Sequence, residues 1–262
     1  MSRPRAHPDR RGRGPKGPAG AHVVAGERAV AELLAFAPAR VRRLLVAPTR
    51  VEHELVARAR ALGIAVERAE PATLQRLAAD GPAKGMVALA EPPPLLELDV
   101  LLQRAAADPW ARLVALDGVV DPHNKGAILR SAEFFGAVGA LWPRDRSAPV
   151  TPAVVRASAG ASERLPLCEV GNFARALRDC KDAGLWIVGT VADGGQPLAE
   201  LARPGVLPQQ LVVVLGSEHE GIRRLSREHC DFLVTIERRG GIASLNVSAA
   251  AAVVLAALRA PS

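Results

Sequence analysis

The sequence has no tyrosine, few other aromatic residues and few cysteines. Aromatic residues make up 3% of the 262 residues, and the only cysteines are Cys168, Cys180 and Cys230. These three form neither a CxxC pair nor a zinc-ligand spacing, so a disulfide scaffold is excluded and a reducing cytoplasm is expected. Since 49% of the residues are hydrophobic, the core must consist of small aliphatic side chains. One or two globular domains, each of roughly 100–200 residues, fit this length.

Long apolar runs are also missing. The longest, 249–258, is far shorter than the roughly 20 residues that cross a bilayer. Residues 1–20 lack the apolar segment of a secretory signal. We therefore expect a cytoplasmic protein without a membrane partner. The same twenty residues contain six basic residues against one acidic residue, out of a net charge of +7. They predict a disordered basic tail that either lies along phosphate groups or has no role.

The rest of the chain alternates between helical and strand patterns. Residues 21–90 predict a small α/β unit with, in order, helix 26–36, strand 41–47, helix 51–63, strand 64–68, helix 71–79 and strand 86–90. Three consecutive prolines at 92–94 favour a stiff connector, so a linker and a connecting helix are expected over 91–109. Over 110–262, apolar strands alternate with amphipathic helices. This pattern is typical of a mostly parallel sheet covered by helices on both faces.

Common nucleotide and hydrolase motifs are absent. The sequence contains no GxGxxG after its first strand, no GxxxxGK[ST], no HExxH and no GxSxG, which removes support for kinases, P-loop enzymes, zinc proteases and nucleotide-dependent oxidoreductases. His219 and His229 lack a third ligand at a suitable spacing, so no metal is expected. Polar residues gather instead where apolar strands end, which is where ligands bind in parallel α/β sheets.

The first polar group is DPHNKGAILRSAEFFGA, after the strand at 112–118. Asn124 stands near a helix start, where it either caps the helix or belongs to a site. Gly126 would allow a close approach. Arg130 follows Asn124 by six residues and is rotated from it by about 240° around the helix. Arg130 is therefore either a solvated or paired helix residue or a reactive group on a different face.

The other two groups are LGSEHEGIRRL and IERRGGIASLNVSAAAAVVL. Glu218 either favours a helix start through the helix dipole or belongs to a site. Ser244 either caps the long carboxyl-terminal helix or belongs to a site. Asn246 would then lie inside the first turn of an apolar helix, where an unpaired amide is costly.

Together and in this order, the three segments resemble the signature motifs of the SpoU family of AdoMet-dependent RNA ribose 2′-O-methyltransferases, in the SPOUT superfamily. The resemblance covers the chain from about Arg112 onward. It implies a parallel-sheet α/β domain over 110–262 with a deep trefoil knot, the cofactor S-adenosyl-L-methionine (AdoMet) and a homodimer whose active site draws on both subunits. HVVAGERAVAELL and LLVAPTR look like the small α/β substrate-binding domain that precedes the catalytic domain in rRNA members.

The resemblance also implies an RNA partner. It favours methylation of a guanosine in 23S rRNA, since the simplest tRNA members use short helical extensions in place of an amino-terminal domain. A tRNA methyltransferase of the same family and a catalytically silent RNA-binding ribosome-assembly protein are the alternatives.

Site residues follow from the same resemblance. Asn124, Glu218, Ser244 and Asn246 would hold the ribose or orient Arg130, which has the activating role in this family. A guanidinium is a poor base, so Arg130 either accepts the proton beside a substrate phosphate or positions that phosphate and stabilises the alkoxide.

The cofactor would bind mostly through the backbone of Thr190, Gly216, Ile236 and Leu245. His219 and the loop 238–240 depart from the family pattern, which puts the substrate in doubt and leaves the reaction unaffected.

Overall fold

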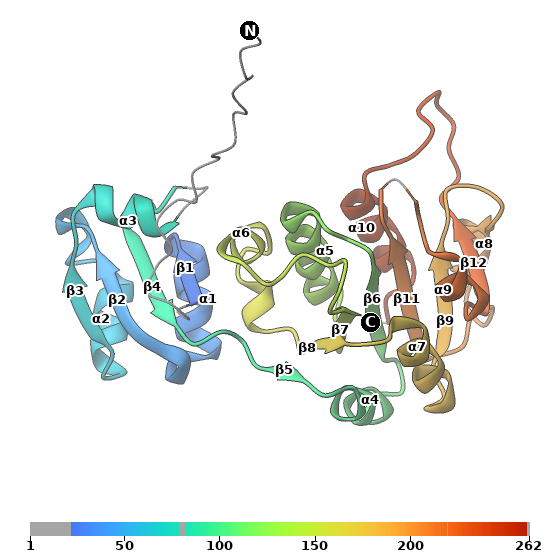
Figure 1. The fold of residues 1–262 in the computed structure, drawn as a ribbon, viewed down its shortest axis with the longest axis horizontal. Coiled ribbons are helices and arrows are strands. Elements are labelled where there is room, and N and C mark those ends of the chain that lie inside the picture. The colour runs from blue at the N-terminus through green and yellow to red at the C-terminus, as the bar shows by residue number, and fades with distance from the viewer. Residues whose placement is uncertain (1–21, 79–81, 219, 261–262) are drawn as a thin grey trace, which may run out of the picture.

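The computed structural model describes residues 22–78, 82–218 and 220–260. The predicted basic tail lies outside these residues. Two sheets organise the described chain (Figure 1). A four-stranded sheet in residues 22–90, here called the amino-terminal unit, has the order β1-β4-β2-β3, and an eight-stranded sheet has the order β10-β12-β9-β11-β6-β7-β8-β5.

The amino-terminal unit is a mixed sheet covered by short helices. Its elements are β1 (His22–Ala25), α1 (Glu27–Phe36), the 3-10 turn η1 (Pro38–Arg40), β2 (Val41–Val46), η2 (Pro48–Arg50), α2 (Glu54–Ala61), β3 (Ala65–Arg68), α3 (Pro71–Ala78) and β4 (Met86–Ala90). β4 runs antiparallel to β1 and β2, while β2 and β3 are parallel. The helix predicted at 26–36 is confirmed, and its apolar stripe, Val30, Leu33 and Leu34, is buried. The sequence pattern had not predicted β1.

The proline connector leads into the second sheet. After the prolines, β5 (Leu95–Leu96) pairs with the edge strand β8 (Leu167–Val170), and α4 (Leu98–Ala106) follows. Figure 1 shows this segment running from the amino-terminal unit to the domain that contains the eight-stranded sheet.

The second sheet is parallel throughout its described pairs, so the predicted parallel α/β architecture is confirmed. Its remaining strands are β6 (Arg112–Asp117), β7 (Gly139–Pro143), β9 (Trp186–Thr190), β10 (Gln196–Pro197), β11 (Leu211–Gly216) and β12 (Phe232–Thr235). Its remaining helices are α5 (Pro122–Phe134), α6 (Pro152–Ala157), the turn η3 (Ala161–Glu163), α7 (Phe173–Asp182), α8 (Leu198–Leu201), α9 (Arg224–Glu228) and α10 (Val247–Ala257).

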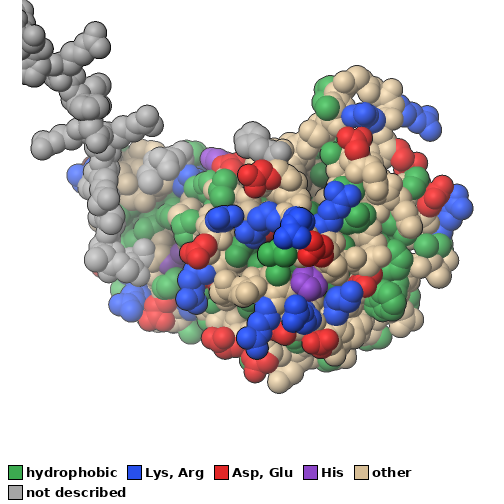
Figure 2. All heavy atoms as spheres, turned by 45° about the vertical axis from the view of Figure 1, so that its right-hand side comes forward, with side chains coloured by type: hydrophobic (Ala, Val, Ile, Leu, Met, Phe, Trp, Pro, Cys, Tyr) green, Lys and Arg blue, Asp and Glu red, His purple; other side chains and the backbone are tan. Residues whose placement is uncertain are grey.

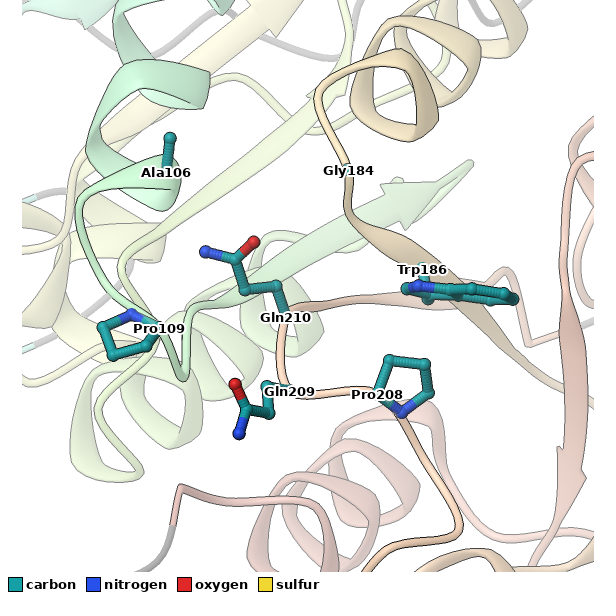
Figure 3. Close-up of a pocket in the computed structure, with 7 residues that line it drawn as sticks. All are labelled: Ala106, Pro109, Gly184, Trp186, Pro208, Gln209 and Gln210. Atoms are coloured by element: carbon teal, nitrogen blue, oxygen red, sulfur yellow. The ribbon is translucent and has the colours of Figure 1, made fainter.

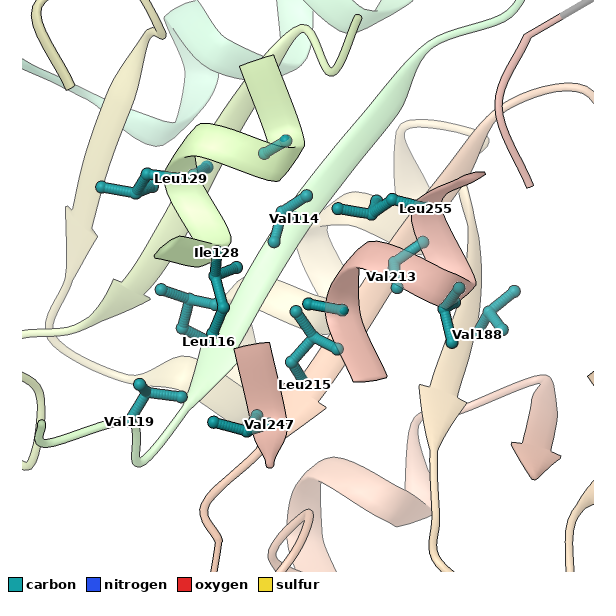
Figure 4. Packing of buried hydrophobic residues seen from close by; sticks show 14 of the residues in the cluster. Val114, Leu116, Val119, Ile128, Leu129, Val188, Val213, Leu215, Val247 and Leu255 are labelled. Atoms are coloured by element: carbon teal, nitrogen blue, oxygen red, sulfur yellow. The ribbon is translucent and has the colours of Figure 1, made fainter. Parts of the chain in front are cut away.

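Successive side chains of the central strands enter different cores. In β6, Val114 and Leu116 pack beneath α5 and α10, whereas Leu113 and Ala115 pack against α4 and α7. Figure 4 shows the first of these cores, with α5 and α10 lying against β6 and β11. Because both faces are covered, the central strands are apolar along most of their length, which is why their sequence pattern predicted them.

Candidate active site

Four adjacent strands end at one edge of the parallel sheet. β12, β9, β11 and β6 are neighbours in that order, and since they are parallel their carboxyl ends align. Thr190 and Gly216 end β9 and β11, and Ile236 directly follows β12. The three polar segments predicted from the sequence all start from this edge or return to it.

The loop after β6 leads into α5, and Asp121 caps that helix. The Asp121 carboxylate accepts hydrogen bonds from the backbone N–H groups of His123 (3.2 Å) and Asn124 (3.1 Å). Asn124 therefore lies in the first turn, and the interpretation of Asn124 as the cap is wrong. Its side chain is left available for other contacts. Gly126 makes the predicted close approach, because a Cβ there would collide with α6.

The segment after β11 forms a tight turn instead of a helix. Ser217 and Gly221 exchange two backbone hydrogen bonds of 3.0 Å each. Gly216 has no room for a Cβ against the backbone of Gly221. The next helix, α9, begins only at Arg224, so the interpretation of Glu218 as a helix-start residue is wrong. His219 lies outside the described residues.

Asn246 caps the carboxyl-terminal helix. Its Oδ1 accepts hydrogen bonds from the backbone N–H of Ser248 (2.8 Å) and from the Ser248 hydroxyl (2.6 Å). α10 therefore begins at Val247, and the interpretation of Ser244 as its cap is wrong. The amide of Asn246 is not stranded inside an apolar helix, since each of its polar atoms is hydrogen-bonded.

Asn124, Glu218 and Asn246 meet in a closed set of hydrogen bonds, here called the amide–carboxylate cluster. Glu218 Oε1 accepts from Asn124 Nδ2 (2.8 Å) and from Asn246 Nδ2 (2.5 Å). Asn246 Nδ2 also donates to Asn124 Oδ1 (3.0 Å). Glu218 Oε2 makes no hydrogen bond within residues 22–78, 82–218 and 220–260, so it can accept one from a bound hydroxyl.

Arg130 and Ser244 make no hydrogen bond with the amide–carboxylate cluster among the described residues. Arg130 is exposed on α5 and makes no hydrogen bond or ion pair with any described residue. Ser244 is exposed in the segment 237–245, where the Arg238 guanidinium donates to the carbonyl of Ala243 (3.1 Å). The structure thus brings together three of the five residues predicted for catalysis.

The residues predicted to hold the cofactor border the same edge. The Thr190 hydroxyl donates to the carbonyl of Val214 (3.0 Å) and ties β9 to β11. Two large apolar side chains, Ile242 and Leu245, are 79% and 52% exposed in the segment before α10. Strand-end backbone and exposed aliphatic side chains fit AdoMet, whose adenine is flat and apolar with a polar edge and which has no pyrophosphate.

An ion pair with a fully buried carboxylate stabilises this edge of the sheet, and sequence reasoning missed it. Asp117, which ends β6, is fully buried and accepts hydrogen bonds from the backbone N–H (2.9 Å) and Nε (2.5 Å) of Arg223. The pair joins the end of β6, the strand that leads to Asn124, to Arg223, two residues after the turn that contains Glu218. A charge at the end of an otherwise apolar strand was the signal that could have revealed it.

Lys125 is a second residue that the sequence reasoning missed. Its side chain is fully buried, with Nζ 2.6 Å from the carbonyl of Ala148 and 3.4 Å from the ring centroid of Trp142. Burial lowers the pKa of Lys125 to about 7. Through its hydrogen bond to Ala148, Lys125 holds the loop between β7 and α6 against the start of α5.

An open cavity of about 450 Å³ lies at the opposite edge of the sheet (Figure 3). Trp186, Pro208 and Gln210 line it where β9 and β11 begin. It shares no residue with the amide–carboxylate cluster. Within residues 22–78, 82–218 and 220–260, no group of three His, Cys, Asp or Glu could hold a metal ion.

Comparison with known families agrees with this placement of motifs. Residues 111–256 match the model of the SpoU rRNA Methylase family. The chain belongs to the SpoU family. Residues 23–96 match a second model, described as RNA 2′-O ribose methyltransferase substrate binding. In the described part of this SpoU protein, no helix has the length and apolarity needed to cross a membrane.

Relatives of this SpoU protein span most of its length. It is 42% identical to the 23S rRNA (guanosine-2′-O-)-methyltransferase RlmB of Pseudomonas putida over 179 residues, 67% of this chain and 70% of the relative. It is 34% identical to RlmB of Salmonella typhimurium over 236 residues, 89% and 96% of the two chains. The SpoU methyltransferase AviRb of Streptomyces viridochromogenes, crystallised with AdoMet, superposes with a TM-score of 0.73 at 26% identity and covers 92% and 89%.

Proposed function

We propose that this protein transfers a methyl group from AdoMet to the ribose 2′-hydroxyl of a guanosine in 23S rRNA, in the cytoplasm. The observation that carries the proposal is the amide–carboxylate cluster, built from all three SpoU motifs at the carboxyl edge of the sheet. The relatives named RlmB support the choice of 23S rRNA, and so does the match of residues 23–96 to a substrate-binding model.

The cluster would hold the ribose. Asn124 and Asn246 fix Glu218 through Oε1, which leaves Oε2 to accept a hydrogen bond from a ribose hydroxyl. Such orientation is a main source of rate enhancement in a displacement that needs two groups in line. AdoMet would be held by strand-end backbone at Thr190, Gly216 and Ile236 and by Leu245, and when bound it supplies the electrophilic methyl group.

Arg130 would act on the reacting hydroxyl or on the adjacent phosphate. Its guanidinium has no partner among the described residues and is exposed, so it is free to bind a phosphate oxygen in two-point geometry. In that position it stabilises the developing alkoxide. The alternative role, proton acceptance, needs the substrate phosphate close by, because the guanidinium alone is a weak base.

We also propose that the segment from β12 to α10 forms the trefoil knot. α10 returns from the exposed segment 237–246 to pack on α5 and β11. The chain therefore leaves the sheet edge and re-enters the core beside elements that precede it in the sequence. The resemblance of the three polar segments to the SpoU motifs, which implies such a knot, supports this arrangement.

The protein would act as a homodimer that completes the active site. Phe134, 78% exposed on α5, lies four residues after Arg130 and so shares its helix face. Val253 on α10, which packs beside α5, is 42% exposed. Large exposed apolar side chains on neighbouring helices are typical of an interface. A second subunit on this face would bring Arg130 toward the partner's site, which accounts for the lack of a hydrogen bond between Arg130 and the amide–carboxylate cluster of its own chain.

Phe134→Glu is expected to convert the dimer into a monomer and to abolish methyl transfer, because it places a charge in the apolar interface. Light scattering coupled to gel filtration measures the mass, and circular dichroism checks the fold. Leu225→Glu is the matched control and should stay dimeric, because Leu225 is 54% exposed on α9, which packs beside α7 on the other side of the sheet. A monomeric wild type, or a dimeric Phe134→Glu variant, would refute this interface.

The function is tested by incubating the purified protein with radiolabelled AdoMet and either unmodified 23S rRNA or unmodified tRNA. Mass spectrometry of the nucleosides then identifies the product. We expect 2′-O-methylguanosine in 23S rRNA only. Label in tRNA would overturn the choice of substrate, and AdoMet binding without transfer to either RNA would favour a silent RNA-binding protein.

A further inference from the structure

The amino-terminal unit rests on residues 152–163 of the catalytic domain, here called the docking segment, which comprises α6 and η3. Figure 1 shows α6 between the amino-terminal unit and α5. α6 contacts β1, and η3 contacts α1. Val155 of α6 belongs to the same buried cluster as Val24 and Val30 of the amino-terminal unit. The two parts of the chain therefore share a continuous apolar core at this place.

Glu163 ends the docking segment with a carboxylate that has no exposed surface. Its Oε1 is 2.9 Å from His22 Nε2, and its Oε2 accepts a hydrogen bond of 2.6 Å from Arg40 Nη1. Both partners belong to the amino-terminal unit. Burial alone would raise the pKa of Glu163, but the hydrogen bond and charge of His22 and the charge of Arg40 outweigh it and lower that pKa. The carboxylate is therefore ionised at neutral pH and bound from two sides.

Further polar contacts between the two parts of the chain surround Glu163 and its partners His22 and Arg40. Arg164 reaches Glu133 of α5 (3.1 Å) and Glu32 of α1 (3.7 Å), so one guanidinium bridges the catalytic helix and the amino-terminal unit. Arg156 donates to the carbonyl of Ala78 at the end of α3 (2.9 Å), where a helix leaves its carbonyls unpaired. These contacts fix the orientation of the unit, since they lie on different elements.

The other side of the docking segment packs on the helix that carries the site. At Gly126, two residues after Asn124, α5 comes so close to Val154 and Ala157 that a Cβ would not fit. A shift of the docking segment would therefore displace the first turn of α5. The chain of contacts runs from Arg40 through Glu163 and α6 to Gly126 and Asn124.

We infer that Glu163 is a positioning residue that fixes the RNA-recognising unit against the docking segment, so that an RNA held by this unit presents its ribose at Asn124 and Glu218. This inference rests on the proposed function. It assigns Glu163 no contact with the substrate. Its role is to set the distance between two RNA contacts, and a loose unit would lower the effective concentration of the second contact and so weaken RNA binding.

Glu163→Gln tests the inference, because it removes the charge and keeps the size. With a 23S rRNA transcript we expect KM to rise about tenfold while kcat stays within about twofold, the pattern of lost binding without lost chemistry. Calorimetry should show unchanged AdoMet affinity. Small-angle scattering should show a larger radius of gyration, since the unit separates from the docking segment.

Glu228→Gln is the matched control, since Glu228 is an exposed glutamate of the same domain paired with Arg224, and exposed pairs contribute little. Arg40→Gln removes a partner of Glu163 that lies in the amino-terminal unit. It should have the same effects as Glu163→Gln and serves as the second test if Glu163→Gln folds poorly. Unchanged KM and scattering in both variants would overturn the inference. If the radius of gyration increases in both variants but the wild type methylates no RNA, Glu163 still docks the amino-terminal unit and the proposed function is refuted.

Discussion

Arg130→Ala is expected to lower kcat for methyl transfer by about 10²–10³-fold or more, as measured losses of a single charge-stabilising group do. Arg130 is exposed on α5, and its side chain has no partner among the described residues, so its removal breaks no contact of the fold. The melting temperature and the AdoMet affinity measured by calorimetry should therefore match those of the wild type. Near-normal turnover would exclude Arg130 from the chemistry.

The conservative variant Arg130→Lys separates the two proposed roles. If Arg130 positions a phosphate and stabilises the alkoxide, a lysine keeps the charge but loses the two-point geometry, and part of the activity should remain without a new pH dependence. If Arg130 accepts the proton, the variant's rate should gain a titration near the pKa of the lysine. Arg175→Ala, at an exposed arginine on α7, is the control for a general loss of positive charge.

Lys125→Met is expected to raise the free energy of unfolding at pH 7 by about 1–3 kcal/mol, because the desolvation cost of a buried charge, several kcal/mol, exceeds the cost of leaving the Ala148 carbonyl without its donor. Lys125 has no exposed surface, and its Nζ lies 3.4 Å from the ring centroid of Trp142. A methionine can fill the same volume. Urea unfolding followed by circular dichroism measures the difference.

The pH dependence gives the sharper test of Lys125. Burial lowers the pKa of Lys125 in the folded state to about 7, whereas an exposed lysine titrates at about 10.4. Between these values the unfolded chain binds one proton more than the folded chain, so stability rises with pH. Lys125 should contribute roughly 3 kcal/mol to the rise between pH 7 and pH 10, at about 1.4 kcal/mol per pH unit.

The free energy of unfolding of Lys125→Met relative to the wild type should therefore be highest at and below pH 7 and should fall by roughly 3 kcal/mol toward pH 10. Lys84→Met, at an exposed lysine, is the control and should follow the wild type at every pH. Parallel pH curves for Lys125→Met and the wild type would contradict the lowered pKa of Lys125.

The helix boundaries show where sequence reasoning reached its limit. Ser, Asn and Asp cap helices about equally well, so residue type alone does not decide between Ser244 and Asn246 at one helix or between Asp121 and Asn124 at the other. The sequence pattern suggested Ser244 and Asn124. The structure selects Asp121 and Asn246, because packing on the sheet decides where each helix begins. This selection also changes the site, since it frees the amide of Asn124 for Glu218.

Of the five residues predicted for catalysis, the structure joins Asn124, Glu218 and Asn246, and their geometry was predictable only in part. Helix periodicity correctly separated Arg130 from Asn124. No local pattern could show that Glu218 Oε1 accepts from two amides located 94 residues before it and 28 residues after it. Asp117 and Arg223 were missed for the same reason, since a pair separated by 106 residues leaves only an isolated charge in each segment.

The sequence by itself determined the alternation of strands and helices, the parallel sheet and the three polar segments at strand ends. Those features depend on side chains close together in the chain, whose period and turn chemistry can be read directly. Only the tertiary structure decided that Asn124, Glu218 and Asn246 bond to one another and that Glu163 joins the amino-terminal unit to the catalytic domain. These contacts depend on strand order and on how the helices pack, which bring together residues up to 141 positions apart.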